Sequence, residues 1–571
     1  SLDTSCSLVH NREKSKNKQI RPTNYQTQGN TMERIWQKHY GDKIPAEVNI
    51  PADATLSSLF DTACEKHADR TAFSSFGATR TYGEVHALSR NFAAWLQNEL
   101  GIKKGDRIAL MTPNCMAFPV AMFGIIAAGA IQVNVNPLYT GRELRHQLQD
   151  ADTDTIVIFT GSTPVLAEAL EGTKIKNIVT LTLDDYLGAG IPSPPADESL
   201  TITSSLTDAT TKGADQTFTD PGLTGSDYVF LQYTGGTTGL SKGAALTHTN
   251  LVSNIEQIKA YLGETISEDG EIVITAIPLY HIFALVVNCL MYVSVGGTIV
   301  LITNPRDMPG FVAEMGKWKF TVFTGVNTLY NGLLMTPGFE DLDFSALRYC
   351  LGGGSAVQEA VSNRWNEVTG HHICEGFGMS ETSPVVSVNL VPAQSFSGTI
   401  GIPVSSTDIS IRDEDGKELG FGEAGELCIK GPQVMPGYWR QDEANKEAFW
   451  PDGYLRSGDV AELSEDGFLK VVDRMKDMVL VSGFNVYPNE IEGVVAMMDE
   501  VAECACIGVP DDATGEALKL FVVKKDDGLT PETIIEYARK NLTGYKVPKQ
   551  IAFIDEVPKS TVGKILRREL R

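Results

Sequence analysis

The chain lacks the cysteine spacing that a disulfide framework or a zinc site requires. Its nine cysteines are spread over 571 residues without a CxxC pair, a pattern typical of a reducing compartment. Cys504 and Cys506 lie in an apolar, alternating run, and His371–His372 has no partner at zinc spacing. We therefore expect core cysteines and no metal site built from cysteine or histidine.

Positive charge is also scarce. The 48 lysines and arginines are outnumbered by 72 aspartates and glutamates, which gives a formal net charge of −24. Such a surface repels nucleic acid and anionic lipid at long range. We expect no nucleic-acid partner, and any membrane association has to be hydrophobic or use a local basic patch.

Long uninterrupted apolar runs are absent. Proline and glycine interrupt residues 116–135, which favours a buried helix followed by a core strand over a membrane span. Gly296-Gly297 divides residues 282–301 in the same way. No signal peptide is visible, because residues 1–31 are polar and show no apolar period. We expect them to be a disordered leader or an upstream extension.

Helix-like and strand-like segments alternate over residues 56–181 and again over residues 228–389. This alternation predicts an α/β fold in which helices cover mainly parallel sheets. The polar residues 187–224 lie between the two parts and are expected to form an exposed connection. Residues 398–430 are rich in strand and turn signals, which predicts a β-subdomain within this large N-terminal domain.

Beyond Asp473 the pattern changes. Residues 491–497 and 531–541 are helix-like, and residues 502–509 and 518–523 are strand-like. We expect a small C-terminal α+β domain of about a hundred residues.

The most informative stretch is Tyr233–Gly243, YTGGTTGLSKG. Glycine lets backbone N–H groups approach an anion, threonine hydroxyls add donors, and lysine supplies positive charge. Apolar segments on both sides predict a loop that joins two strands. We therefore expect a phosphate-binding loop that contains Thr234, Gly235, Gly236, Thr237, Thr238, Gly239 and Lys242.

Two other motifs nearly fit this stretch. A Walker A loop has glycine before its lysine and serine or threonine after it, whereas Ser241 precedes Lys242 and Gly243 follows it. The P-loop NTPase interpretation therefore fails. Residues 239–243 also match GxSxG, so a hydrolase with Ser241 as nucleophile stays open, although the glycine- and threonine-rich run before it disfavours a sharp elbow.

Weaker signals follow along the chain. In Glu375–Thr382, EGFGMSET, Phe377 could cover a planar ring, and Glu381 could hold Mg²⁺ on phosphates. The alternative is that this stretch is a glycine turn between two strands. Leu351–Ala356, LGGGSA, would let a nucleotide approach bare backbone. Asp459 suits ribose hydroxyls or caps a turn.

A basic loop, Pro558–Arg568, enters a helix-like segment near the end of this acidic chain. Its lysine at position 564 is a candidate for anion binding. A solvated basic terminus would explain the same pattern.

These stretches occur together and in one order, and in this they resemble the adenylate-forming superfamily, which includes acyl-CoA synthetases, peptide-synthetase adenylation domains and beetle luciferases. Three further segments are similar to bacterial long-chain fatty-acyl-CoA synthetases: Val479–Glu490 (VLVSGFNVYPNE), Pro278–Leu285 (PLYHIFAL) and Leu542–Pro548 (LTGYKVP). The resemblance covers Met32–Arg571.

The resemblance implies ATP, Mg²⁺ and coenzyme A. In the family, a carboxylate attacks the α-phosphate of ATP and releases pyrophosphate, and the thiol of coenzyme A then displaces AMP from the acyl-adenylate. Residues 234–242 would hold the β- and γ-phosphates, and Thr234 with Glu381 would help to fix Mg²⁺. The nucleotide would also be enclosed by Gly353, Gly354, Ser355, Glu375, Gly376, Phe377, Gly378 and Ser380.

The family also implies roles near the C-terminus. Asp459 and Arg474 would take the ribose hydroxyls. Lys564 would bridge the substrate carboxylate and the α-phosphate during the first half-reaction.

A rotation of the small domain is implied as well. Lys476 matches the hinge position, and the rotation would bring Ser482, Gly483 and Phe484 toward the pantetheine arm. The corresponding division of the chain is a leader at 1–31, a large domain at 32–473, a hinge at 474–476 and a small domain at 477–571.

His281 matches the aromatic-motif position of the family. It either gates the acyl pocket or the coenzyme A tunnel, or it packs in the core. Ser380 stands where many relatives have threonine, which keeps the hydroxyl. Leu285 stands where some long-chain relatives carry a gating tryptophan, so that gating is not transferred to this chain.

We expect an AMP-forming acyl-CoA synthetase for a medium- or long-chain fatty acid. The alternatives are a ligase for another carboxylate such as an aryl acid, delivery of acyl-AMP to a carrier protein, an esterase that uses Ser241, or a nucleotide-binding module without catalysis. The resemblance further implies a cytoplasmic protein, with peripheral association at the inner face of the cell membrane and a homodimer as open expectations.

Overall fold

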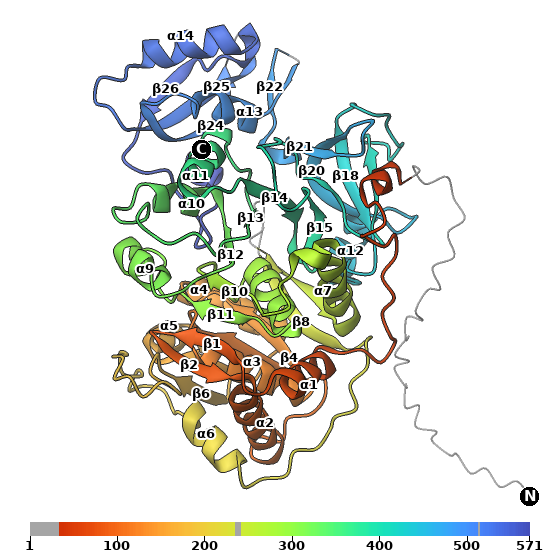
Figure 1. The fold of residues 1–571 in the computed structure, drawn as a ribbon, viewed down its shortest axis with the longest axis vertical. Coiled ribbons are helices and arrows are strands. Elements are labelled where there is room, and N and C mark those ends of the chain that lie inside the picture. Colours follow the sequence, from red (N-terminus) through yellow and green to blue (C-terminus); the bar gives the residue numbers. More distant parts are fainter. Residues whose placement is uncertain (1–33, 235–240, 483, 512–513) are drawn as a thin grey trace, which may run out of the picture.

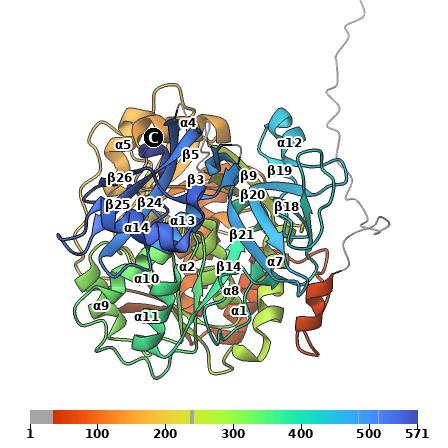
Figure 2. The same ribbon diagram turned by 90° about the horizontal axis from the view of Figure 1, so that it is seen from above.

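The computed structural model describes residues 34–234, 241–482, 484–511 and 514–571 (Figure 1). Within these residues, two large sheets alternate with layers of helices. A smaller antiparallel sheet lies beside them, and the C-terminal residues form a domain of their own, seen in blue at the top of Figure 1 and in front of the other layers in Figure 2.

The first large sheet has nine strands in the order β16-β15-β14-β13-β12-β10-β11-β1-β2. Its centre is parallel, from β1 through β11, β10, β12 and β13 to β14. The strands are β1 (Thr71–Ser75), β2 (Ala78–Thr81), β10 (Ile272–Thr275), β11 (Thr298–Leu301), β12 (Val322–Gly325), β13 (Tyr349–Gly352), β14 (Ile373–Gly378), β15 (Val385–Val388) and β16 (Ile402–Pro403).

The second large sheet has eight strands in the order β19-β9-β8-β4-β3-β5-β6-β7. It is parallel from β8 to β7, and β9 and β19 add an antiparallel edge. The strands are β3 (Arg107–Met111), β4 (Ile131–Val135), β5 (Thr155–Phe159), β6 (Asn177–Leu181), β7 (Ser204–Ser205), β8 (Tyr228–Thr234), β9 (Lys242–Thr247) and β19 (Gly437–Tyr438).

One continuous apolar core joins the facing sides of these sheets with the helices between them. A capping box of Thr81 and Glu84 starts α2, which satisfies N–H groups that a helix leaves without partners. The inner helices are α1 (Leu56–His67), α2 (Tyr82–Asn98), α3 (Ala117–Ala127), α6 (Leu206–Gly213), α7 (His248–Leu262) and α8 (Met291–Ser294).

Other helices cover the outer faces. The outer core of the nine-stranded sheet includes Phe311, Tyr330 and Trp365 from three helices, and that of the eight-stranded sheet includes Leu144 and Leu166. The result is the layered arrangement that alternating elements predict. These helices are α4 (Gly141–Ala151), α5 (Thr163–Ala169), α9 (Met308–Met315), α10 (Asn327–Leu334) and α11 (Glu359–Thr369).

The apolar segments fold as predicted. In residues 116–135, α3 is buried along its whole length and β4 follows it as a buried strand. In residues 282–301, a helical stretch that includes the π-helical segment η4 (Ala284–Leu290) precedes β11. No helix in the described part of the chain is long and apolar enough to cross a membrane.

The predicted exposed connection at residues 187–224 is partly wrong, because it contains α6. Leu206, Ala209, Thr210 and Gly213 recur at helical spacing and form its buried side. Gly213 lies so close to α2 that a Cβ atom there would be 1.9 Å from the carbonyl oxygen of Asn91. The short helix therefore belongs to the inner layer.

The β-subdomain is an antiparallel sheet in the order β17-β18-β20-β21. Its strands β17 (Asp408–Arg412) and β18 (Gly425–Lys430) confirm the strand-rich prediction, and α12 (Asp442–Ala448) leads to β20 (Leu455–Leu463) and β21 (Leu469–Arg474). The last strand ends where the smaller domain begins.

The smaller domain is an α+β unit with its own core. Four of its elements, α13, β24, β25 and α14, overlap the segments that the sequence predicts, whereas β22, β23 and β26 were not predicted. Cys504 and Cys506 are free and buried in β24. The elements are β22 (Val479–Val481), β23 (Phe484–Val486), α13 (Pro488–Val495), β24 (Val501–Asp511), β25 (Gly515–Lys524), α14 (Pro531–Asn541) and β26 (Gln550–Phe553).

A buried charge cluster ties this domain to the end of β21. Arg567 pairs with Glu492 at 2.7 Å, and with Asp473 and Asp477 at 3.5 Å each. Asp473 also accepts a hydrogen bond of 3.0 Å from the backbone N–H of Asn489. Arg567 therefore contacts carboxylates on both sides of residues 474–476.

Candidate active site

The predicted phosphate loop joins β8 and β9, as the apolar flanks of the sequence indicate. Thr234 ends β8, Lys242 begins β9, and the two residues are paired across the hairpin. The Thr234 hydroxyl lies 3.5 Å from the carbonyl oxygen of Lys242. The remaining predicted loop residues lie outside the described part of the chain: Gly235, Gly236, Thr237, Thr238 and Gly239.

Ser241 does not have the surroundings of a hydrolase nucleophile. A nucleophile elbow turns from a strand into a helix, whereas strand β9 follows Ser241 directly. Nε2 of His146 donates to the backbone carbonyl of Ser241 at 3.0 Å. The same nitrogen therefore cannot accept the serine proton, and the structure contradicts the esterase alternative.

Glu381 and Lys242 are brought together through a residue that the sequence analysis did not select, Tyr438. The Tyr438 hydroxyl donates to Oε1 of buried Glu381 at 2.7 Å, and Nζ of Lys242 lies 5.4 Å from the centre of the Tyr438 ring. Burial and the Glu381 carboxylate raise the pKa of Tyr438, so it stays a donor. Its place follows from β19, which pairs with β9.

The two glycine-rich stretches form neighbouring strand ends. Gly352 of β13 is paired with Glu375 of β14. A Cβ atom on Gly353 would lie 3.5 Å from the carbonyl oxygen of Gly376, and one on Gly378 would lie 2.1 Å from that of Pro384. The strand ends thus expose backbone that a larger residue would cover or displace.

Three buried polar atoms at this edge have no hydrogen-bond partner among the described residues: Ser355 Oγ, Glu375 Oε2 and Ser383 Oγ. Burial raises the pKa of Glu375 to about 8, although its other oxygen accepts from the N–H of Val357 at 3.3 Å. Buried polar atoms are normally paired. This cluster therefore fits a polar ligand such as a nucleotide, beside the half-buried ring of Phe377.

Asp459 and Arg474 face each other on β20 and β21. Nε of Arg474 lies 3.2 Å from Oδ1 of Asp459, and the carboxylate is buried while the guanidinium is half exposed. Burial raises the pKa of Asp459, and the positive charges of Arg474, Lys564 and Lys476 oppose that shift. The structure thus brings these four predicted site residues together.

Lys564 reaches this edge from the small domain. A Cβ atom on Gly354, whose φ is +78°, would lie 3.3 Å from Cε of Lys564. Burial and the charge of Arg474 lower the pKa of Lys564 to about 8, against the attraction of Asp459 and Glu381. Lys476 also has its pKa lowered to about 8, mainly by burial.

His281 caps a helical turn. Its Nδ1 accepts a hydrogen bond of 3.3 Å from the backbone N–H of Phe283, just before η4. Burial and the charge of Lys564 lower the pKa of His281 to about 3, so the ring is neutral. These contacts place His281 beside Lys564, and the two interpretations left open by the sequence both stay predictions.

The contacts of the described residues do not join Ser482 or Phe484 to Lys564, Asp459 and Arg474. Both are exposed on the small domain, where Phe484 stacks on Tyr545 at 4.6 Å and Ser482 has a φ of +52°. Gly483 lies outside the described residues. A hollow of about 230 Å³ beside Ser482 is lined by Val481, Ser482, Thr514, Ala517, Leu518, Gly544, Tyr545, Val547 and Lys549.

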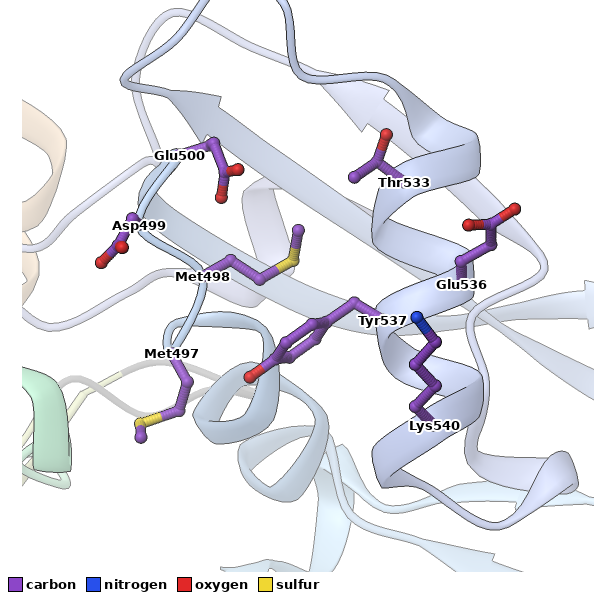
Figure 3. Close-up of a pocket in the computed structure, with 8 residues that line it drawn as sticks. All are labelled: Met497, Met498, Asp499, Glu500, Thr533, Glu536, Tyr537 and Lys540. Atoms are coloured by element: carbon purple, nitrogen blue, oxygen red, sulfur yellow. The ribbon is translucent and has the colours of Figure 1, made fainter.

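A second hollow, of about 340 Å³, opens between α14 and the turn after α13 (Figure 3). Met498 and Tyr537 point into it, with Lys540 and Glu536 on the adjoining helix. None of the predicted site residues lines it.

Comparison with known proteins decides the family. Residues 60–439 match the family described as AMP-binding enzyme, and residues 490–564 match the AMP-binding enzyme C-terminal domain. This chain belongs to the AMP-binding enzyme family. The first match includes β17 and β18 of the β-subdomain, whereas β20 and β21 lie between the two matches.

Individual relatives of this AMP-binding enzyme extend over nearly the whole chain. The long-chain-fatty-acid–CoA ligase of Salmonella typhimurium is 48% identical over 555 residues, which is 95% of this chain and 98% of that protein. The enzyme of the same name from Bacillus subtilis is 35% identical over 94% of this chain and 98% of its own length.

A solved structure also matches this AMP-binding enzyme. ATP-bound MatB from Rhodopseudomonas palustris is 29% identical, with a TM-score of 0.78, and the match covers 90% of this chain and 98% of that one.

Replacing Tyr438 with phenylalanine should leave Glu381 without its hydroxyl donor. If Glu381 holds Mg²⁺, as the family resemblance implies, the Tyr438 hydroxyl orients that carboxylate, and Tyr438→Phe should lower Mg²⁺ affinity or activity by about 10- to 100-fold. Titration of AMP release with Mg²⁺ measures this. Tyr228→Phe, on the exposed start of β8, is the matched control, and an equal loss in both variants would contradict the role of Tyr438.

The lowered pKa of Lys564 predicts a pH dependence. Burial and the charge of Arg474 lower the pKa of this lysine to about 8, so its charged form predominates below about pH 8 and is lost progressively above it. If that charge is needed, kcat/KM for pyrophosphate release should fall as pH rises through about 8, because kcat/KM reports the free enzyme.

The Lys564→Arg variant distinguishes this lysine from Lys476, since arginine keeps its charge. Its residual activity should lack the alkaline fall. A fall of unchanged position in that variant would assign the titration to another group.

Proposed function

We propose that this chain is an AMP-forming ligase that converts a medium- or long-chain fatty acid to acyl-CoA at the expense of ATP. The observation that carries the proposal is the position of Lys564, a cation from the small domain beside the glycine-rich strand ends and the Asp459–Arg474 pair. Identity of 48% to a long-chain-fatty-acid–CoA ligase, over 95% of this chain, supports the substrate class.

The first half-reaction joins two anions. A carboxylate oxygen of the fatty acid attacks the α-phosphorus of ATP, pyrophosphate leaves, and an acyl-adenylate remains. Lys564 would neutralise charge where the two anions meet. Thr234 and Lys242 would hold the β- and γ-phosphates at the hairpin end.

Glu381 and the Thr234 hydroxyl are the residues that would hold Mg²⁺. No group of three acidic, histidine or cysteine side chains forms a metal cage in the described residues, which fits an ion held by one or two protein oxygens and substrate phosphates. Bound there, Mg²⁺ would neutralise charge on the departing pyrophosphate.

The adenosine part would lie along the strand ends. The partnerless oxygens of Ser355 and Glu375 and the ring of Phe377 would face the adenine, with Gly353, Gly354 and Gly376 exposing backbone. Gly378 and Ser380 would complete the cradle on the way to Glu381. Asp459 and Arg474 would take the ribose hydroxyls.

In the second half-reaction the sulfur of coenzyme A attacks the acyl carbonyl carbon, and AMP leaves. We assign residues 32–473 to the large domain, 474–476 to the hinge with Lys476, and 477–571 to the small domain. A rotation at the hinge would withdraw Lys564 and present Ser482, Gly483 and Phe484 to the pantetheine arm. The exposure of Ser482 and Phe484 supports this.

The proposal places the enzyme in the cytoplasm, with peripheral contact at the inner face of the cell membrane and assembly as a homodimer. The family resemblance supports these three points. A ligase for an aryl acid, or one that passes acyl-AMP to a carrier protein, would use the same nucleotide site.

Release of AMP and pyrophosphate tests the proposed reaction. With ATP, Mg²⁺ and coenzyme A, we expect release that depends on a fatty acid of medium or long chain, together with acyl-CoA. A series of graded chain lengths and one aryl acid should be measured side by side. Release with the aryl acid alone would overturn the assigned substrate class.

Lys564→Ala tests the division of labour between half-reactions. Adenylation, measured as fatty-acid-dependent exchange of pyrophosphate into ATP, should be lost by a factor of about 10² to 10³, the range for removing one charge-stabilising group. Formation of acyl-CoA from supplied acyl-AMP should be unchanged. Equal loss of both activities would contradict the rotation.

A further inference from the structure

Residues 558–566, here called the Lys564 loop, are held together by hydrogen bonds of their own. The N–H of Ser560 donates to the carbonyl of Lys564 at 2.7 Å, and the N–H of Lys564 donates to the Ser560 hydroxyl at 3.1 Å. The N–H of Leu566 donates to the carbonyl of Pro558 at 2.8 Å. Because these bonds close the loop on itself, the position of the lysine depends on where the loop as a whole is held.

Three side chains of the large domain hold the loop from outside. The hydroxyls of Tyr280 and Thr561 are hydrogen-bonded to each other, and Nδ2 of Asn136 lies 3.3 Å from the Thr561 hydroxyl. The Thr328 hydroxyl donates to the carbonyl of Gly563 at 3.1 Å. These contacts lie one to three residues from Lys564.

The partners of Thr561 are themselves fixed. Tyr280 is 8% exposed, and its carbonyl accepts a hydrogen bond of 2.9 Å from Gln232. Oδ1 of Asn136 accepts from the N–H of Leu138 at 3.0 Å, which turns its amide nitrogen toward Thr561. A buried tyrosine hydroxyl needs a partner, and here that partner is on the other domain.

We propose that Tyr280 and Thr561 are a positioning pair that seats the Lys564 loop for adenylation. The pair touches neither reacting atom and acts through the lysine. It is formed only while the loop is docked, so it stabilises the docked position of the small domain over any other. This inference rests on the proposed role of Lys564 in the first half-reaction.

Tyr280→Phe removes the hydroxyl and keeps the ring. We expect fatty-acid-dependent pyrophosphate exchange to fall by about tenfold, the loss that follows from one partly buried hydrogen bond. Acyl-CoA formation from supplied acyl-AMP should stay at the wild-type rate. The KM for ATP should change little, because the tyrosine contacts the loop and not the nucleotide residues.

Thr561→Val should reproduce this result from the other side. Thr561→Val also removes the contact with Asn136, so if the two hydroxyls act as a pair, the double variant should lose no more adenylation than Thr561→Val alone. Independent, multiplying losses would overturn the pairing.

Tyr292→Phe is the matched structural control, because its buried hydroxyl bonds to Tyr349 at 2.9 Å within the large domain. It should change both half-reactions alike. The inference is wrong if Tyr280→Phe also changes both alike while Lys564→Ala impairs adenylation alone. Absence of any fatty-acid-dependent exchange in the wild type would instead contradict the proposed function.

Discussion

The scarcity of positive charge is the constraint on which this site depends. A carboxylate and a triphosphate have to meet in a protein with a net charge of −24, so cations have to be supplied locally. Lys242, Arg474, Lys476 and Lys564 come from β9, β21, the segment after it and the C-terminal loop. Burial, and after it the charge of Arg474, lowers the pKa of Lys476 and that of Lys564, and Asp459 and Glu381 oppose that effect on Lys564.

The layered fold explains how such distant segments meet. Ligands of open α/β sheets bind outside the carboxyl ends of parallel strands. Here β8 of one large sheet and β14 of the other end at residues predicted for nucleotide binding, and β13 ends just before the predicted Gly353. The antiparallel additions β9 and β19 carry Lys242 and Tyr438 back to the same edge.

Local elements could be predicted where the sequence contains its own start and stop signals. Helix α14 has the predicted bounds, because Thr530 caps it and Pro531 occupies its first turn. Helix α6 was missed because only eight residues carry its pattern within a polar stretch.

The site was predictable only where residues form a local pattern. Glu381 and Lys564 lie in recognisable motifs, and the structure brings Lys564 to Gly354 and Asp459. Tyr438 follows a Pro-Gly pair, which predicts a turn but gives no indication that Tyr438 contacts Glu381. The contact of Tyr280 with Thr561 spans 281 positions, and no local pattern encodes a pair at that separation.

The charge cluster around Arg567 has a consequence for the proposed hinge. Asp473 is buried, and its partners Arg567 and the N–H of Asn489 belong to the other side of residues 474–476. A buried carboxylate that loses its partner is costly. Orientations in which Asp473 has left these partners and found no others are therefore disfavoured, and we expect the proposed rotation at residues 474–476 to lead to a few defined orientations.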